Sequence, residues 1–439
     1  MSSPNAAETA LERATRVAIR VLLGVEAGRR ATDLFPELLS ELPPSERGEV
    51  VETVYAVLRD QRRLEAAVNA IATSPVRPRD RARSWCLAHL ILRGALSPEA
   101  AQANLQGLDF ARLPSAYEVV LHGLGFEARL ALEHNLPEWL VGALLEDHGP
   151  VDGEVLIRSL SQPPPFTLRA NRLKGDRQGL ADQLLAHGVP STPTRWSPDG
   201  LNLDRRRDVY GYTEFQAGAF EVQDEGSQLI ALLVAPPPKG LVIDVCAGAG
   251  GKTLALGALL KGQGRLLACD VPSAEKRLDE LGRRARRAGL SNLQAVITPA
   301  EGAWPEPLAR LEHKADRVLV DAPCSGSGVL RRNPEARLSL TAEKVGRLAE
   351  LQLRILERAL SLVHPKGRLI YATCSLLRAE NDGVIERFLA KHPDLERVPL
   401  KEILGKELAL GIGDGDVLRL LPSRHGSDGF YAAVLRFRR

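Results

Sequence analysis

The fold is decided by the stretch Asp244-Val245-Cys246-Ala247-Gly248-Ala249-Gly250-Gly251-Lys252-Thr253, which follows an apolar run and opens an amphipathic one. Glycines at such a turn let the backbone approach a ligand closely, and a helix N-terminus favours negative charge. The next apolar run ends at Asp270, where an acidic residue usually hydrogen-bonds the hydroxyl groups of a ribose. The stretch therefore predicts an α/β domain that binds an adenosine-bearing ligand.

Short apolar runs alternate with amphipathic ones along residues 226–439. The apolar runs are LVIDVC (241–246), RLLACD (265–270), LQAVIT (293–298), RVLVDAP (317–323) and RLIYATC (368–374). Strands alternating with helices indicate a doubly wound, mostly parallel, Rossmann-like sheet. The last apolar stretches, near Val417 and Phe430, predict an appended antiparallel hairpin.

Two further regions precede this sheet. Residues 1–145 repeat apolar side chains at three- and four-residue spacing, which predicts an all-helical domain. Residues 146–225 contain the hinge-like Pro163-Pro164-Pro165, an extended run and a helical run, which is typical of a small α/β module. We therefore predict three domains, over residues 1–145, 146–225 and 226–439.

The bulk composition predicts a soluble, cytoplasmic, globular protein. Hydrophobic residues make up 44% and charged residues 26% of the 439 residues. The N-terminal stretch MSSPNAAETALERATR lacks an apolar signal core, and no run approaches the length of a membrane span. The five cysteines are odd in number and form no C-x-x-C pair, which argues against a disulfide framework or a metal site. We expect a monomer with reduced thiols and no metal.

The net charge of +3 does not by itself indicate a nucleic-acid partner. The arginines are nevertheless clustered. A single cluster usually forms a solvated face, whereas several clusters around one site would form a track for phosphates. The clusters are Arg205-Arg206-Arg207, Arg283-Arg284 with Arg286-Arg287, Arg331-Arg332, and Arg436 with Arg438-Arg439.

Three classes of protein could use the glycine-rich turn. A dinucleotide-dependent dehydrogenase needs G-x-G-x-x-G, and this turn lacks the third glycine in register. A P-loop nucleotide-binding enzyme needs glycine where Cys246 stands, and it has no use for a ribose-binding acid at Asp270, although Asp321 could be proposed as its Mg²⁺ ligand. A methyltransferase that uses S-adenosylmethionine accommodates all of these features.

Two later strands end in residues that can do chemistry. One ends in Asp321-Ala322-Pro323-Cys324-Ser325-Gly326 and another in Ala372-Thr373-Cys374-Ser375. Strand ends of a doubly wound sheet open on the same crevice, so we expect Asp321, Cys324 and Cys374 to converge beside the adenosine site. We expect Cys86, within a helix, and Cys269, within a strand, to be small buried hydrophobic residues.

Two cysteines and an aspartate suit methylation of a pyrimidine. Carbon 5 of cytosine is a poor nucleophile until a thiolate adds to carbon 6 and makes carbon 5 enamine-like. A carboxyl group beside ring nitrogen 3 would stabilise the charge that develops, and Asp321 is the candidate. One cysteine suffices for the attack, and the second can assist proton removal and release of the product.

These residues resemble the RNA cytosine-C5 methyltransferase family, in its bacterial ribosomal form that carries a NusB-like domain. The match rests on D-A-P-C-S-G at 321–326, T-C-S at 373–375, Arg331-Arg332-Asn333-Pro334, Glu380-Asn381 and Asp428-Gly429-Phe430. The resemblance implies that Cys374 is the nucleophile and that Cys324 serves product release. It also implies that Lys252 and the Cys246–Gly251 turn hold the amino-acid end of S-adenosylmethionine, that Asp270 holds its ribose, and that Glu301 lies near its adenine.

The resemblance extends over nearly the whole chain, with one departure in the turn. The family's usual C-A-A-P-G-G-K-T appears here with Gly248 and Ala249 in place of alanine and proline, which should loosen the unbound loop. The helical region resembles NusB and implies small-subunit (16S) ribosomal RNA as the substrate, and the module at 166–203 resembles an RNA-contacting one.

Three alternatives remain open for the function, namely the P-loop nucleotide-binding enzyme described above and the two that follow. One is an RNA-binding or ribosome-assembly protein with an inactive methyltransferase domain, although the retention of both Cys324 and Cys374 argues against it. The other is DNA cytosine methylation, in which Cys324 would be the attacking group and Cys374 would have no role.

Overall fold

The computed structural model describes residues 9–438, and its contacts divide the chain into two compact units. The first contains the chain up to Gln162 together with Leu330–Thr341, and the second contains Pro163–Val329 and the chain from Ala342 onward. The start of the polar N-terminal stretch (1–8) and Arg439 of the last arginine cluster lie outside the described residues. The three predicted domain ranges are continuous in sequence, whereas these units are not.

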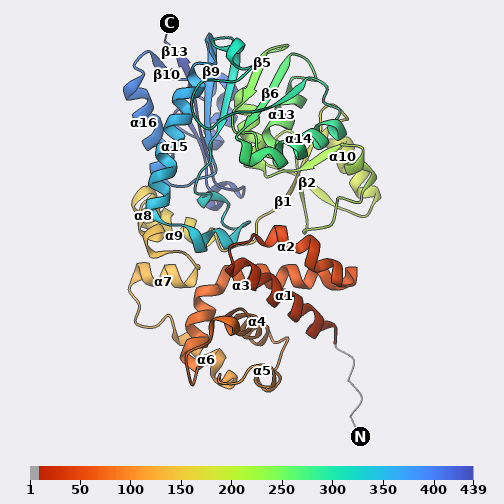
Figure 1. The fold of residues 1–439 in the computed structure, drawn as a ribbon, viewed down its shortest axis with the longest axis vertical. Helices are drawn as coiled ribbons and strands as arrows, with labels where there is room; N and C mark the ends of the chain where they lie inside the picture. Colours follow the sequence, from red (N-terminus) through yellow and green to blue (C-terminus); the bar gives the residue numbers. More distant parts are fainter. Residues whose placement is uncertain (1–8, 439) are drawn as a thin grey trace. The chain divides into compact units, whose positions relative to one another are not determined.

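The first unit is helical, as predicted, and its part up to Gln162 appears in red to yellow in Figure 1. Its first helix is capped by Thr9, whose hydroxyl oxygen accepts from the N–H of Glu12 while the Glu12 carboxylate accepts from the N–H of Thr9. Valine and leucine side chains from the longer helices form one buried core. The helices are α1 (Ala10–Glu26), α2 (Ala31–Leu38), α3 (Pro44–Ile71), α4 (Arg81–Leu92), α5 (Pro98–Asn104), α6 (Leu113–Val119), α7 (Phe126–Glu133), α8 (Glu138–His148) and α9 (Pro150–Ser159).

The segment Leu330–Thr341 follows the D-A-P-C-S-G motif in sequence but packs within the helical unit. Its 3₁₀ helix Pro334–Ser339 buries the guanidinium of Arg337, which donates to three backbone carbonyl oxygens. The bond to Leu160 measures 2.7 Å, and those to Arg59 and His134 measure 3.3 and 3.4 Å. Burial, with the nearby charge of Arg59, lowers the pKa of Arg337 to about 9. The segment is thus fixed to the helices by an arginine side chain.

The second unit begins with a small antiparallel sheet in the order β2-β3-β1-β4. This small module consists of β1 (Phe166–Ala170), α10 (Arg177–Ala186), β2 (Ser191–Pro193), β3 (Gly200–Leu203), α11 (Thr213–Gln216) and β4 (Phe220–Val222). Its helix and strands enclose a core of their own, with Leu168, Leu184 and Phe220 fully buried.

The large sheet of the second unit has the order β11-β12-β13-β9-β8-β5-β6-β7, and β10 pairs with β13. The neighbouring strands β9, β8, β5, β6 and β7 run parallel to one another. Strand β13 pairs antiparallel with β9 and with β12. The predicted mostly parallel sheet and its antiparallel hairpin are therefore confirmed. The strands are β5 (Leu241–Asp244), β6 (Arg265–Asp270), β7 (Leu293–Ile297), β8 (Ala315–Asp321), β9 (Val363–Thr373), β10 (Leu395–Arg397), β11 (Gly413–Asp414), β12 (Val417–Leu420) and β13 (Phe430–Phe437).

Helices cover both faces of this sheet (Figure 1). Side chains alternate along each strand, so that Val320 packs towards α15 and α16 whereas Leu319 packs towards α12 and α13. Helix α14 packs beside α13, through Leu278, Leu281 and Ala285. The helices are α12 (Glu225–Val234), α13 (Gly251–Leu259), α14 (Glu275–Ala288), α15 (Ala342–Leu360), α16 (Asp382–Lys391), α17 (Lys401–Leu404), α18 (Lys406–Ile412) and α19 (Pro422–His425).

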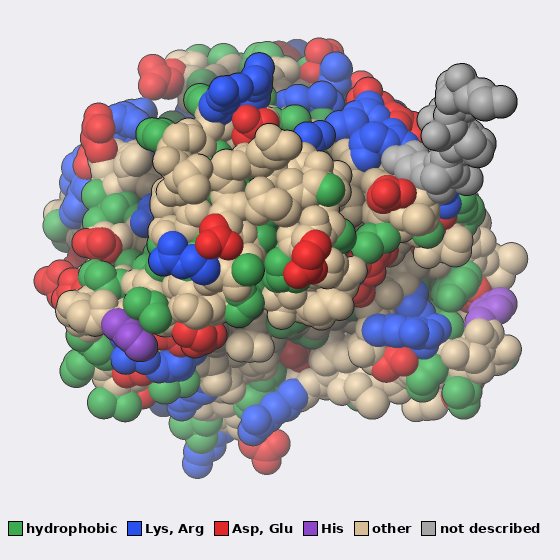
Figure 2. Space-filling view, turned by 90° about the horizontal axis from the view of Figure 1, so that it is seen from below, with side chains coloured by type: hydrophobic (Ala, Val, Ile, Leu, Met, Phe, Trp, Pro, Cys, Tyr) green, Lys and Arg blue, Asp and Glu red, His purple; other side chains and the backbone are tan. Residues whose placement is uncertain are grey.

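The surface carries charges of both signs. Figure 2 shows Lys and Arg side chains interspersed with Asp and Glu on the face that it presents, without one continuous basic patch. Within residues 9–438, no helix is long and apolar enough to cross a membrane.

Candidate active site

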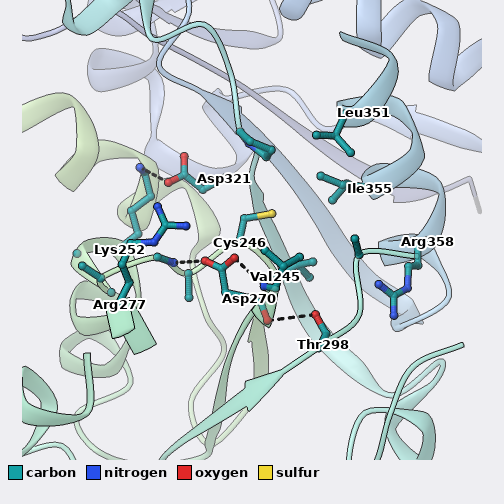
Figure 3. A pocket seen from close by; sticks show the side chains of 18 of the residues that line it. Val245, Cys246, Lys252, Asp270, Arg277, Thr298, Asp321, Leu351, Ile355 and Arg358 are labelled. Atoms are coloured by element: carbon teal, nitrogen blue, oxygen red, sulfur yellow. Dashed lines mark hydrogen bonds and ion pairs between the residues drawn. The ribbon is translucent and has the colours of Figure 1, made fainter. Parts of the chain in front are cut away.

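The site lies where the order of the parallel strands reverses. The chain passes from β5 outward to β6 and β7, then returns to place β8 on the other side of β5. Loops leave in opposite directions at such a point and open a crevice. A cavity of about 590 Å³ occurs there. Its lining, most of which is drawn in Figure 3, consists of Ser227, 245–252, Asp270, Val271, Arg277, 298–300, Trp304, Asp321, Pro323, Leu351, Ile355 and Arg358.

The glycine-rich turn forms one wall of this cavity. Gly248 and Gly250 have φ values of +54° and +83°, a region that side chains other than glycine rarely adopt. The N–H of Gly248 donates to Asp270 Oδ2 at 2.8 Å, and the N–H of Val271 donates to Asp270 Oδ1 at 2.8 Å. The carboxylate of Asp270 is therefore fixed at the end of β6, beside the turn (Figure 3).

Lys252 links the turn to the end of β8. Its Nζ lies 2.6 Å from Asp321 Oδ2, and both side chains line the cavity (Figure 3). Burial alone would lower the pKa of Lys252, but the charge and hydrogen bond of Asp321 outweigh burial, and the pKa is raised. The Cys374 sulfur also contributes to this rise, so Lys252 and Cys374 interact electrostatically. The ion pair with Asp321 thus keeps Lys252 charged within the buried site.

The two cysteines predicted for the reaction lie side by side. The Sγ atoms of Cys324 and Cys374 are 3.3 Å apart, at the ends of the neighbouring parallel strands β8 and β9. The hydrogen bond with Cys374, followed by burial, raises the pKa of Cys324 well above its usual value. Cys324 is therefore held in the thiol form, which can donate a proton.

A buried carboxylate joins the two cysteine loops. Glu380 Oε1 accepts from the N–H of Ser325 at 2.8 Å, and its Oε2 accepts from the Ser375 hydroxyl at 2.6 Å. Gln352 on α15 donates to the same carboxylate and to the carbonyl of Pro323. Each cysteine is the residue just before one of these serines, so Glu380 sets the spacing between the two thiols.

The remaining cysteines are not placed for nucleophilic chemistry. Burial raises the pKa of Cys86 to about 12 and raises that of Cys269 well above its usual value. Burial also raises the pKa of Cys246, with further contributions from the carboxylates of Asp244, Asp270 and Asp321. These thiols therefore remain protonated at neutral pH.

The structure brings most of the predicted residues together, with one outlier. Residues Cys246 to Lys252, Asp270 and Asp321 line the cavity. The paired Cys324 and Cys374 come three residues after Asp321 and directly after Thr373. Glu301 lies outside the lining, with its side chain 76% exposed and paired with Arg354 at 3.6 Å.

Several lining residues are absent from the sequence prediction. Thr298 and Pro299 follow β7, so the same strand-end argument could have found them. Leu351, Ile355 and Arg358 come from one face of α15 and point towards the cavity in Figure 3. Apolar residues at that spacing usually mark a helix packed on a core, so the pattern could not have distinguished these residues.

The residues present fit S-adenosylmethionine. The turn at the N-terminus of α13, together with Lys252, offers positive potential to a carboxylate, and Asp270 offers an acceptor to ribose hydroxyls. Pro299, Leu351 and Ile355 supply an apolar wall for a planar base. A cavity of about 590 Å³ is of the size that encloses a molecule of this kind.

Comparison with known proteins identifies the family. Residues 231–436 match the model of the 16S rRNA methyltransferase RsmB/F, and residues 136–210 match the ferredoxin-like domain of the same proteins. A probable ribosomal RNA small subunit methyltransferase B of Bacillus subtilis is 31% identical over 96% of this chain and 98% of its own length. The chain belongs to the RsmB/F family. As an RsmB/F protein it is a methyltransferase of the S-adenosylmethionine-dependent type that acts on ribosomal RNA.

Other proteins are similar to this RsmB/F chain in sequence or in fold. Ribosomal RNA small subunit methyltransferase B of Salmonella agona is 28% identical over 94% of this chain and 95% of its own. The crystal structure of PH0851 has a TM-score of 0.80 at 24% identity over 99% of both chains. NSun6 of Pyrococcus horikoshii, crystallised with the S-adenosylmethionine analogue SFG, has a TM-score of 0.60 at 21% identity over 69% of this chain and 98% of its own.

Proposed function

We propose that this RsmB/F protein methylates carbon 5 of a cytosine in 16S ribosomal RNA through a covalent bond between Cys374 and carbon 6. The 3.3 Å contact between the sulfurs of Cys324 and Cys374 carries the proposal. A methyltransferase that forms no covalent intermediate has no need of two adjacent thiols at the ends of neighbouring strands. Covalent catalysis can use one thiol for the attack and the other to assist release.

Donor binding is assigned to the cavity at the switch point. The Cys246–Gly251 turn and Lys252 would hold the amino-acid end of the donor, and Asp270 would hold its ribose. Pro299, Leu351 and Ile355 would cover the adenine. A contact from Glu301 to the adenine would require its side chain to leave Arg354. Bound there, S-adenosylmethionine supplies an activated methyl group.

Cys374 is the proposed nucleophile, and Lys252 acts on it electrostatically. The positive charge of Lys252 lies in the same buried site as Cys374, and the two groups interact electrostatically. The thiolate adds to carbon 6 of the cytosine, and the electron pair of the ring double bond moves to carbon 5. Carbon 5 would then bond to the methyl carbon that S-adenosylmethionine supplies, as the bond from that carbon to the donor sulfur breaks and S-adenosylhomocysteine leaves. These steps leave a methylated ring bonded to the enzyme through sulfur.

Asp321 and Cys324 are assigned to charge stabilisation and release. Asp321, held by Lys252 at 2.6 Å, would lie near ring nitrogen 3. It would accept a hydrogen bond from that nitrogen, which takes up a proton from solvent as the thiolate adds and gives it back on release. Loss of the carbon-5 proton to solvent water restores the ring double bond and expels the Cys374 thiolate. Cys324, whose raised pKa keeps it protonated, returns a proton to the departing sulfur.

The helical unit offers a further surface for RNA. A groove of about 640 Å³ lies between α1, α4 and α5, and Arg16, Arg20 and Arg83 are among its lining residues. Arginines suit phosphate groups because their planar donors match phosphate oxygens. We assign this groove to ribosomal RNA outside the target cytosine.

The deciding experiment is an adduct assay. Wild type, Cys324→Ala and Cys374→Ala are mixed with unmodified 16S rRNA and S-adenosylmethionine, then separated on a denaturing gel. A protein–RNA band that accumulates in Cys324→Ala and is absent from Cys374→Ala supports the proposal. A band that depends on Cys324 reverses the two roles. No band in any sample, with the donor still bound, favours an RNA-binding protein with an inactive domain.

The donor assignment has its own check against a P-loop enzyme. A thermal-shift titration compares S-adenosylmethionine with a nucleoside triphosphate and Mg²⁺. Stabilisation by the first supports the proposal, because a ligand that binds only the folded state raises the unfolding midpoint. Stabilisation by the triphosphate alone would overturn it.

A further inference from the structure

The glycine-rich turn rests on α14 as well as on Asp270. An added Cβ at Gly250 would lie 2.1 Å from Leu281 Cδ1, so the turn and the helix are in close contact. Three residues later on the same helix, Arg284 donates from Nη1 to the carbonyl oxygen of Ala249 at 2.6 Å. The peptide plane between Ala249 and Gly250 is therefore held by a guanidinium.

The same guanidinium is fixed from the other side by the small module. Arg284 Nη2 lies 2.9 Å from Glu221 Oε2, and Arg284 Nε donates to that oxygen at 3.3 Å. Glu221 belongs to β4 and is only 4% exposed, and its second oxygen pairs with Arg287. Glu221 thus connects the small module to the donor turn through Arg284.

The module has little freedom to move away from α14. An added Cβ at Gly218 would lie 2.0 Å from the carbonyl oxygen of Arg287. Asn171 donates to the carbonyls of Gly218 and Ala288 at 2.8 and 2.9 Å, and so joins the two elements. The Arg287 guanidinium also lies 3.8 Å from the centroid of the Phe215 ring. Glu221 is therefore presented to Arg284 from a fixed position.

We propose that Arg284 is a positioning residue of the donor site, which holds the Ala249 carbonyl and takes its own position from Glu221. The inference rests on the proposed donor site. It explains how this turn stays ordered although Ala249 stands where the family pattern has proline: a side chain supplies from outside the restraint that a proline ring would supply from within. Arginine is required because only its fork of donors reaches a carbonyl and a carboxylate at once, whereas lysine presents a single ammonium.

The test measures donor affinity without RNA, so that it does not depend on the methylation chemistry. Calorimetric titration with S-adenosylmethionine compares wild type, Arg284→Lys and Glu221→Gln, with Arg283→Ala as the control. Arg283 is the adjacent residue, is largely exposed and pairs with Glu280 on its own helix. Arg284→Lys should weaken donor binding about tenfold, which is the loss of one charge-assisted hydrogen bond. Glu221→Gln should weaken it in the same direction by about threefold, and Arg283→Ala should have no effect.

A rescue variant separates positioning from general stability. Adding Ala249→Pro to Arg284→Lys should restore most of the lost affinity, because the ring stiffens the turn directly. The KM for the donor should follow the affinity, while kcat stays within about twofold. Equal donor affinity in wild type, Arg284→Lys and Glu221→Gln would overturn the inference, and so would a loss in Arg284→Lys that Ala249→Pro does not restore. A wild type that binds no donor would instead overturn the proposed function.

Discussion

The sulfur atoms of Cys324 and Cys374 are close enough to hydrogen-bond, at 3.3 Å. A pair of thiols at this distance is susceptible to oxidation, because a thiol oxidant such as diamide can take two electrons and two protons from the pair and leave a disulfide. We expect diamide to abolish methylation and a thiol reductant to restore it. Mass spectrometry of the non-reduced protein should show a loss of about 2 Da, with both cysteines in one cross-linked peptide pair.

Donor binding in the oxidised protein provides the control for that prediction. The cavity lining does not include either cysteine, so affinity for S-adenosylmethionine should change by less than about twofold. Loss of donor binding would show that the oxidant acts elsewhere. If diamide inactivates Cys86→Ser to the same extent as wild type, the buried thiol of Cys86 in the helical unit plays no part in the oxidation.

Glu380 should control the rate without controlling donor affinity. Its carboxylate connects the N–H of Ser325 to the hydroxyl of Ser375 and so sets the spacing of the cysteines. Glu380→Gln keeps the size of the side chain but turns one acceptor into a donor. We expect kcat and the yield of the covalent adduct to fall at least tenfold, because small misplacements of reacting groups are costly. The control is Glu386→Gln, whose carboxylate pairs with Arg378 at the surface.

Asp270 should control donor affinity without controlling the cysteines. Its two oxygens accept from Gly248 and Val271 at 2.8 Å each, which leaves further lone pairs for the ribose. We expect Asp270→Ala to weaken binding of S-adenosylmethionine by at least tenfold, measured by calorimetry, and to leave adduct formation at saturating donor intact. Asp279→Ala, on the exposed side of α14, should bind the donor normally. Unchanged affinity in Asp270→Ala would remove this residue from the ribose site.

The sequence predicts those parts of the fold and site that depend on local pattern. Alternation of apolar and amphipathic runs placed β5 to β9, and the rule that parallel strands end at one edge placed Asp321 beside Asp270 and Lys252. Charge clusters were harder to interpret, because Arg283 and Arg284 are neighbours in sequence yet one is solvated and the other holds the turn. The rotation of α14 about its axis, which places Leu281 against the turn, decides which of the two arginines faces inward.

Two further features depend on contacts between distant parts of the chain. The segment Leu330–Thr341 packs with the helical unit because Arg337 finds carbonyl groups there that lie far away in sequence. Glu301 was assigned by its place in the family pattern, but its loop turns the side chain outward to Arg354. No local sequence pattern predicts the hydrogen-bond partners of Arg337 or the direction in which the side chain of Glu301 points.

Arg83 should contribute to RNA affinity through the groove of the helical unit. It lines the groove with Arg16 and Arg20, and its side chain is exposed. We expect Arg83→Ala to weaken binding of 16S rRNA a few-fold and to reduce the slope of log affinity against log salt by about 1, as for the loss of one phosphate contact. Arg310→Ala, in the second unit and paired with Glu306, is the matched exposed control. An unchanged salt slope would place the RNA elsewhere.

Asp244 should make the stability of the fold depend on pH. It lies at the end of β5, is buried, and accepts from the Thr253 hydroxyl at 2.7 Å. Burial raises the pKa of Asp244 from 3.8 to about 7. Between these two values the folded chain binds more protons at this group than the unfolded chain, so the contribution of Asp244 to stability falls as the pH rises from about 4 to about 7. The full loss is up to about 4 kcal/mol, at about 1.36 kcal/mol for each pKa unit.

Asp244→Asn isolates this effect, because the amide oxygen can still accept from Thr253 but cannot ionise. We expect the variant and the wild type to unfold at similar urea concentrations near pH 5, and the variant to be the more stable at pH 8. The difference in their free energies of unfolding, plotted against pH, should grow through the window that ends near pH 7. A constant difference from pH 5 to pH 8 would show that Asp244 has the same pKa in the folded and unfolded chains. The carboxylate would then be stabilised by contacts other than Thr253.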